Sequence, residues 1–235
     1  MRVTAGVFSI TPPAPPDDDG SYLRWHLLDH MPEQFQLPGI QQALRYIADD
    51  ACIAARLVAS AHLADIGNVV NYLAGEPTEQ TLQDFLDLGP ALARAGRFPE
   101  HRKGLQLSAL APRQWVASPA AAVTAPVLPW RPHRGVLFVV EDGAETTPAP
   151  IDAEGIVAVP GVAGVWAYAP EPAWTLSFRF HAEPQHITVI YLDDDPVRTT
   201  QSLRPMLQRR WESGEATPLF AGPLRTMVRW EAWPA

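Results

Sequence analysis

Cysteine is nearly absent from this chain, which has a single cysteine, Cys52, among its 235 residues. One cysteine cannot form a disulfide within the chain, so a reducing environment is the simpler expectation. The neighbouring residues Ala51, Ile53 and Ala54 are apolar, and apolar surroundings raise the pKa of a thiol. Cys52 is therefore a poor candidate for a catalytic nucleophile.

Runs of basic residues and long apolar runs are also missing. The 18 Lys and Arg residues against 26 Asp and Glu give a formal charge of −8, which argues against nucleic acid and anionic membranes as partners. No apolar run approaches the ~20 residues of a membrane span, and the N-terminus carries no pattern of an export signal. We therefore expect a cytoplasmic protein whose ligand is a small molecule.

What the chain does have is enough apolar sequence for a substantial core, with 47% hydrophobic and 19% charged residues. Alternating and amphipathic patterns in the first half predict strands at residues 2–10, 40–48, 66–73 and 105–115, and helices at 22–35 and 78–95. Their order is β-α-β-β-α-β. Residues 1–117 are thus predicted to form one ferredoxin-like unit.

An Ala- and Pro-rich segment at 118–133 predicts a linker, after which the second half, 134–235, resembles the first. The matched pairs along the two halves are Pro38 with Pro160, Tyr46 with Tyr168, Tyr72 with Tyr191, Pro90 with Pro205, and Trp115 with Trp233. The segment 141–159 contains two prolines and no amphipathic pattern, so the first helix of the second repeat is predicted to be lost or reduced to a turn. The predicted fold class is α+β: two tandem ferredoxin-like repeats that form an α/β barrel.

The first predicted helix concentrates ionisable and aromatic residues. Its apolar stripe consists of Leu23, Leu27, Met31 and Phe35, widened by Leu28, and its neighbouring face carries Tyr22, His26, Asp29, His30 and Glu33. His30 lies at the border of the two faces, so its imidazole is expected at the edge of the buried space. Pro32 lacks a backbone N–H, which predicts that the helix loosens just after His30.

The string Tyr22-x-x-Trp25-x-x-x-x-His30-x-Pro32, followed by Leu37-Pro38-Gly39, resembles the EthD-like family of the dimeric α/β-barrel superfamily. The spacing from Trp25 to His30 is one residue longer than in the family pattern. The resemblance implies a barrel of ferredoxin-like repeats with a site on the first helix. Superfamily members include cofactor-independent monooxygenases, polyketide cyclases and dehydratases, stress-response proteins and haem-binding enzymes, so the fold alone implies no single reaction.

His30 is the candidate general acid or base, because an imidazole exchanges protons near neutral pH. His26 and Glu33 are candidate assisting catalytic residues, and Glu33 or Asp29 is expected to orient the imidazole. The alternative interpretation is that His30 bonds a loop carbonyl at a helix end. His26 and His30 also have the i, i+4 spacing of metal ligands, but no second acidic or histidine cluster accompanies them, so no metal site is predicted.

Tyr22, Trp25, Arg45 and Tyr46 are the candidate substrate-binding residues. Arg45 and Tyr46 are adjacent in a predicted strand, so their side chains point to opposite faces of the sheet. Tyr46 has a counterpart in Tyr168, which favours packing, whereas Arg45 has none, which favours binding of a carboxylate or phenolate. Several of the tryptophans, including Trp166 and Trp174, could stack an aromatic ligand.

These features predict an enzyme that acts on an apolar aromatic or polyketide-like molecule in the barrel cavity. The chemistry would be acid/base catalysis by histidine without an organic cofactor, of cyclase/dehydratase or cofactor-independent monooxygenase type. The alternatives are a non-catalytic protein that binds small molecules or other proteins, and a haem-binding protein. A homodimer is possible in each case.

Overall fold

Nine strands form one antiparallel sheet within the residues that the computed structural model describes, which are 2–13, 19–98, 104–143, 151–174 and 185–227. The strands are β1 Ala5–Thr11, β2 Ile40–Ile47, β3 Val58–Ala59, β4 Asn68–Ala74, β5 Gln106–Ala117, β6 Gly135–Asp142, β7 Val162–Ala169, β8 Gln185–Leu192 and β9 Thr217–Thr226. The helical segments are α1 Asp19–Trp25, η1 His26–His30, α2 Met31–Gln34, α3 Asp50–Ala54, α4 Thr78–Arg94, η2 Pro119–Ala121, η3 Ala125–Trp130, α5 Ala153–Val157 and α6 Pro196–Glu212.

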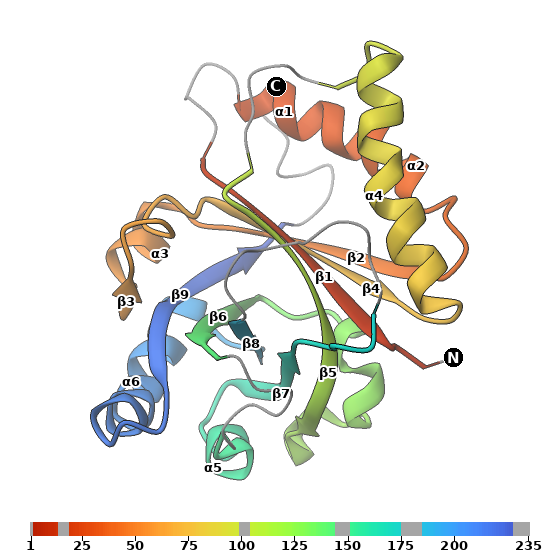
Figure 1. Ribbon diagram of the computed structural model, residues 1–235. Helices are drawn as coiled ribbons and strands as arrows, with labels where there is room; N and C mark the ends of the chain where they lie inside the picture. Colours follow the sequence, from red (N-terminus) through yellow and green to blue (C-terminus); the bar gives the residue numbers. More distant parts are fainter. Residues whose placement is uncertain (1, 14–18, 99–103, 144–150, 175–184, 228–235) are drawn as a thin grey trace.

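The sheet closes into a ring in the order β2-β4-β1-β5-β7-β8-β6-β9, because β9 pairs back onto β2. The two halves have the same internal strand order, since β2-β4-β1-β5 is matched by β7-β8-β6-β9. Helices α1, α2 and α4 cover the outer face of the first half, and α5 and α6 lie outside the second half (Figure 1). The predicted α+β barrel is therefore confirmed.

The Pro-Gly turns before β2 and β7 show how the two halves correspond. Gly39 and Gly161 have φ of 93° and 87°, the left-handed region in which glycine is favoured. Each glycine also lies against a threonine of the following helix, Thr81 for Gly39 and Thr199 for Gly161. The Pro-Gly pairs therefore occupy the same position in each half.

Two matched pairs of the sequence were misaligned. Pro90 is the thirteenth residue of α4 and Pro205 the tenth of α6, so these two prolines are not counterparts. The other pair, Tyr72 with Tyr191, is shifted by one residue. Tyr191 packs inside the ring, whereas Tyr72 packs on the outer face of the sheet. Pro77 is the N-cap of α4, while Pro196 is the first residue of α6 and follows its N-cap. These two prolines are therefore also one residue out of register. Leu73 is therefore the true counterpart of Tyr191. Trp233 lies outside the described residues.

Four short elements were not predicted, and one differs from its prediction. The 3₁₀ segments η2 and η3 lie within the predicted linker. Helix α3 and strand β3 follow β2, and β3 pairs with β9 through Val58 and Ala221. In the second half, a five-residue helix, α5, stands where the sequence predicted a helix lost or reduced to a turn, although residues 144–150 lie outside the described part. Among the described residues, no helix is long and apolar enough to cross a membrane.

The interior of the ring is packed with side chains from both halves. The Phe8 ring lies 5.0 Å from the ring of Tyr168 and 5.9 Å from that of Phe138, measured between centroids. Phe138 in turn approaches Phe220 at 6.3 Å. The expectation of a substrate cavity inside the barrel is therefore wrong, because aromatic side chains occupy that space as a core.

Candidate functional site

The first helical region contains one π-helical turn, η1, between α1 and α2. The backbone N–H of Met31 donates to the carbonyl of His26, five residues back instead of four. Pro32, the second residue of α2, has no N–H to give to the preceding turn. The loosening was predicted just after His30, but the structure has it one turn earlier, as a wider turn over His26–His30.

The wider turn changes which side chains face inward. His26 and His30 are only 4% and 9% exposed, so both are buried and neither lies at a border. Leu28 and Phe35, predicted to belong to the apolar stripe, are 49% and 41% exposed. That part of the stripe was wrong, because the extra residue in the turn rotates these positions toward solvent.

The same turn explains the long spacing between Trp25 and His30. Their rings are stacked, with centroids 4.9 Å apart and planes 16° from parallel. Residues five apart lie one above the other in a π turn but not in an α-helix. The additional residue relative to the EthD-like pattern is thus accommodated without separating Trp25 from His30.

The imidazole of His30 is held by Gln34, one turn along the helix. Their Nε2 atoms are 3.1 Å apart, and Nδ1 of His30 has no partner among the described residues. Burial lowers the pKa of His30 to about 4, opposed by Asp29 and reinforced by the positive charge of Arg45. His30 is therefore neutral at physiological pH.

His26 is linked to His30 through two further side chains. Its Nε2 lies 2.9 Å from the hydroxyl of Tyr72, and the two imidazole centroids are 5.5 Å apart. Burial raises the pKa of Tyr72, while Gln34, which also hydrogen-bonds its hydroxyl, acts in the lowering direction. The order of contacts is therefore His26, Tyr72, Gln34, His30.

A cavity of about 650 Å³ opens beside both histidines. It lies between the outer face of the sheet and the helices of the first half, and it exceeds the cavity of about 500 Å³ beside α5 and α6. Its aromatic and histidine lining residues are Tyr22, Trp25, His26, His30, Tyr72, Phe85 and Phe98. The wall beside the histidines is thus mainly aromatic, as suits an apolar ring system.

Arg45 and Tyr46 point to opposite faces, as predicted. Tyr46 packs inside the ring, where its hydroxyl lies 3.0 Å from Nε2 of His133, so it does not reach the cavity and its predicted substrate contact is wrong. Arg45 is 5% exposed, and its guanidinium lies 5.3 Å from the centroid of Tyr22, a residue of the cavity wall.

Glu33 and Asp29 do not orient His30. Both carboxylates pair with Arg97, at 2.7 Å and 3.2 Å, on the surface of the molecule. Gln34 holds the position that the sequence assigned to an acidic residue. Its i, i+4 spacing from His30 was a signal that could have identified it, whereas Tyr72 and Phe98 come together with His30 only through the fold.

Among the described parts of the chain, no group of three His, Cys, Asp or Glu side chains gathers in a way that could hold a metal ion. Cys52 is not among the residues that line the cavity. Burial raises the pKa of its thiol to about 12, in agreement with the expectation that it is a poor nucleophile.

No protein-family model matches the chain, and no curated protein matches its sequence significantly. Among solved structures, it is similar to an anthrone oxidase-like protein, with a TM-score of 0.59 and 12% identity over 96% of this chain and 92% of the other. It is similar to a chlorite dismutase from Candidatus Nitrospira defluvii, with a TM-score of 0.53 and 14% identity over 97% and 92%. A candidate monooxygenase from Fusobacterium nucleatum gives 0.52 and 8% over 97% and 94%. At these identities the likeness shows the fold alone.

Proposed function

We propose that this protein is an enzyme that removes a proton from a weakly acidic, apolar aromatic or polyketide-like small molecule. The substrate binds between the outer face of the first half-sheet and its helices, and His30 is the base. Cofactor-independent oxygenation and cyclisation or dehydration can all begin with such a step. Membership of the EthD-like family is part of this proposal.

The observation that carries the proposal is the state of His30. Its imidazole is buried, neutral and stacked under Trp25, and it lines a cavity of about 650 Å³ with a ring nitrogen that has no partner among the described residues. Most buried polar groups with a structural role are hydrogen-bonded. His30 instead has a buried nitrogen without a described partner, in a ring that lines space for a ligand.

The proton transfer requires one particular tautomer. Nδ1 must be the acceptor, so the ring proton must lie on Nε2 and be donated to the amide oxygen of Gln34. In the structure the amide nitrogen of Gln34 faces Nε2 of His30, and the amide oxygen has no partner among the described residues. This tautomer therefore requires the amide to be turned over, so that its oxygen accepts from Nε2. His30 takes the proton from the substrate on Nδ1, and the resulting imidazolium and substrate anion attract each other strongly in the buried site.

Deuterium exchange tests this step without knowledge of the natural substrate. Aryl ketones and β-diketones would be incubated with the protein in D2O, and exchange at the acidic carbon would be followed by NMR. We expect catalysed exchange by the wild type, a loss of about 10²-fold or more in His30→Gln, and an intermediate loss in Gln34→Leu. Equal exchange by wild type and His30→Gln, with both proteins folded, would contradict the proposal.

Oxygen uptake separates the two reaction types. Consumption of O2 with a phenolic or enolisable substrate indicates a monooxygenase, whereas product formation without it indicates a cyclase or dehydratase. Ligand binding with neither exchange nor turnover would instead support the alternative of a non-catalytic binding protein.

The described residues do not fit haem. The Nε2 atom of His30 faces Gln34, so it is not free to bind iron, and Trp25 stacks on one face of the ring, where it would limit the space for a macrocycle. We expect no Soret absorption in purified protein, and no stoichiometric zinc, iron or manganese by elemental analysis.

A further inference from the structure

Two arginines are buried among the described residues, and they differ in one respect. Arg210 is 7% exposed and Arg45 is 5% exposed. Arg210 donates from Nε and NH2 to the two carboxylate oxygens of Glu141, at 3.0 Å and 3.1 Å. This side-on arrangement is the bidentate pairing that guanidinium and carboxylate groups favour.

Arg45 leaves the same two donors unused. Its NH1 donates to Oδ1 of Asn68 at 3.2 Å, while Nε and NH2 have no partner among the described residues. Asn68 is neutral, and the carboxylates on the helices above, Asp29 and Glu33, are paired with Arg97. Arg45 is therefore a buried cation with no carboxylate partner in the described part of the chain.

A buried charge without a partner is unfavourable, because desolvation is not repaid by an opposite charge. Water can satisfy the two N–H groups but cannot balance the charge. Arg45 thus resembles Arg210 without its Glu141, because the described residues supply the guanidinium but no carboxylate beside it.

Arg45 is not itself a lining residue of the cavity that holds His30, and it lies behind the wall of that cavity. Tyr22, whose ring centroid is 5.3 Å from the guanidinium carbon, lines the cavity, as does Tyr72 on the neighbouring strand β4. An anion would therefore reach the buried Nε and NH2 atoms of Arg45 by displacing the ring of Tyr22, and it would then lie next to the same site as the base.

We propose that Arg45 is a carboxylate-binding subsite, and that the substrate is an aromatic or polyketide-like carboxylic acid whose two oxygens accept from Nε and NH2. This deepens the proposed function, on which it rests for the identity of the cavity as the substrate site. The two can nevertheless fail separately, because binding of a carboxylate does not require a base.

The test compares two probes of the same shape, naphthoate and the neutral naphthamide, by isothermal titration calorimetry. We expect the wild type to bind naphthoate at least about 10-fold more tightly than naphthamide, a preference within the range of a charged hydrogen-bonded pair. In Arg45→Met this preference should disappear, and in Arg45→Lys it should be reduced, because lysine provides a point charge without the planar fork. Naphthol, as a third probe, should gain less from Arg45 than naphthoate does, because it has one oxygen.

Arg210→Met is the matched control, since it removes a buried arginine that already has its carboxylate. It should lower the melting temperature, because Glu141 is left buried, without changing the preference for naphthoate. Arg45→Met should melt no lower than the wild type without ligand. If Arg45→Met fails to fold, thermal melts of wild type and Arg45→Lys replace it. In each protein the melting-temperature shift caused by naphthoate is compared with the shift caused by naphthamide, and the difference should be smaller in Arg45→Lys.

A wild type with no preference for naphthoate, or an Arg45→Met variant that retains it, would overturn the subsite. His30→Gln separates this inference from the proposed function. It should keep the preference for naphthoate while losing deuterium exchange, and loss of the preference in His30→Gln would count against Arg45 as its source.

Discussion

The acid–base properties of His30 are set by the residues that surround its side chain. Burial, more than any neighbouring charge, lowers its pKa from 6.5 to about 4. A neutral imidazole at physiological pH is ready to accept a proton, but its low pKa makes it a weak base unless the product anion is stabilised. In the proposed site that stabilisation would come from the attraction between the imidazolium and the substrate anion, while Arg45 would hold the substrate's carboxylate.

The free energy of unfolding should depend on the protonation state of His30. Because its folded pKa lies below the unfolded value, the unfolded chain binds the proton more readily between these two pH values. The stability that comes from keeping His30 neutral in the folded protein is therefore fully present above pH 6.5. It is lost as the pH falls towards about 4, which lowers the free energy of unfolding by about 3 kcal/mol in total. Urea unfolding of wild type and His30→Gln between pH 4 and 7 measures this.

The variant lacks the titrating ring, so its free energy of unfolding should vary less with pH over the same interval. The burial of His133 also lowers its pKa, so some dependence on pH remains in both proteins. Parallel curves for wild type and His30→Gln would show that His30 is not buried as a neutral ring.

At the scale of elements, the cavity wall depends on how the end of α4 is attached to the first helical region. Arg97, just after α4, pairs with Asp29 and Glu33, and its carbonyl accepts from Nε1 of Trp25 at 2.7 Å. The next residue, Phe98, packs against Trp25 with ring centroids 5.0 Å apart. These contacts fasten two aromatic wall residues in place.

Arg97→Met should therefore weaken ligand binding more than it weakens the fold. The ion pairs are exposed to solvent, where such pairs contribute little to stability, so the melting temperature should change little. Affinity for naphthoate should fall several-fold, because Phe98 and Trp25 are less well held. Calorimetry and a thermal melt measure the two effects, and a large drop in melting temperature with unchanged affinity would contradict this account.

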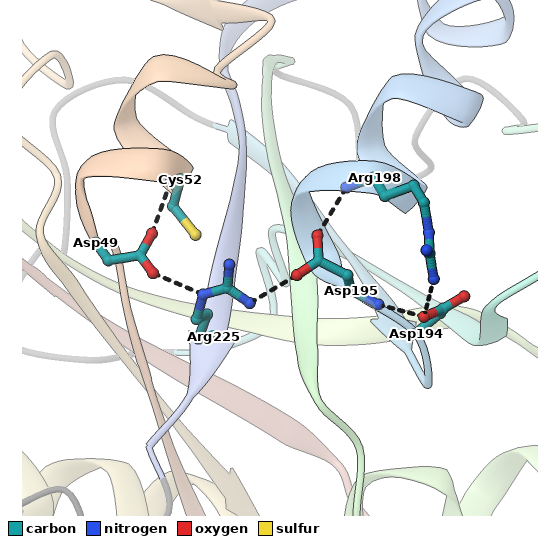
Figure 2. Close-up of polar contacts among 6 residues, drawn as sticks. All are labelled: Asp49, Cys52, Asp194, Asp195, Arg198 and Arg225. Carbon is teal, nitrogen blue, oxygen red and sulfur yellow. Dashed lines mark hydrogen bonds and ion pairs between the residues drawn. The ribbon is translucent and has the colours of Figure 1, made fainter.

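A second set of contacts joins elements of the two halves (Figure 2). Arg225 on β9 donates to Asp49 at 2.6 Å and to Asp195 at 3.0 Å. Each aspartate uses its other oxygen to cap a helix, Asp49 for α3 and Asp195 for α6. One guanidinium thus connects the N-termini of two helices across the place where the ring closes.

Arg225→Met should lower the free energy of unfolding by about 1 kcal/mol, a modest amount because these side chains are partly exposed. The pKa of Asp195 is lowered by the N–H of Arg198 and by Arg225, and the pKa of Asp49 is lowered by Cys52 and Arg225 despite opposing burial. The stabilisation is therefore present above about pH 4 and is lost as the pH falls below it.

Arg198→Met serves as the control, because its side chain pairs only with the exposed Asp194 in the same figure. Chemical unfolding at pH 7 and pH 3 measures both variants. Equal effects of the two substitutions at pH 7 would argue against a role for Arg225 in joining the helices.

At the scale of the whole molecule, the ring has two unequal seams. Strands β5 and β7 are paired at six positions, whereas β2 and β9 are paired at only two, with two more between β3 and β9. The ring is complete within one chain, so a homodimer is not needed to supply strands. The shorter seam should open first.

Hydrogen exchange measured by NMR tests this difference. The amide of Met227, which donates to the carbonyl of Arg45 across the short seam, should exchange faster than the amides that join β5 to β7. Opening there would also disturb the strand that carries Arg45, so exchange should slow when naphthoate is bound. Equal protection of both seams would mean that the ring opens only by global unfolding.

The sequence by itself determined the local elements of this protein. Alternation predicted β2 nearly to the residue, and the amphipathic pattern predicted α4. Asp195 caps α6 ahead of Pro196, as a carboxylate at that position favours. The Pro-Gly turns at Gly39 and Gly161 were equally readable. These features depend on residues within a few positions of one another, where geometry is set by the backbone repeat.

Only the tertiary structure decided which distant groups meet. The π turn that buries His26 and His30, the pairing of Glu33 with Arg97, and the packing that fills the ring all depend on contacts between remote segments. The same holds for Arg45, whose type and strand position were visible in the sequence but whose missing carboxylate was not. Whether a charged side chain has an oppositely charged partner is decided only in the folded chain, because the partner must be close in space and need not be close in the sequence.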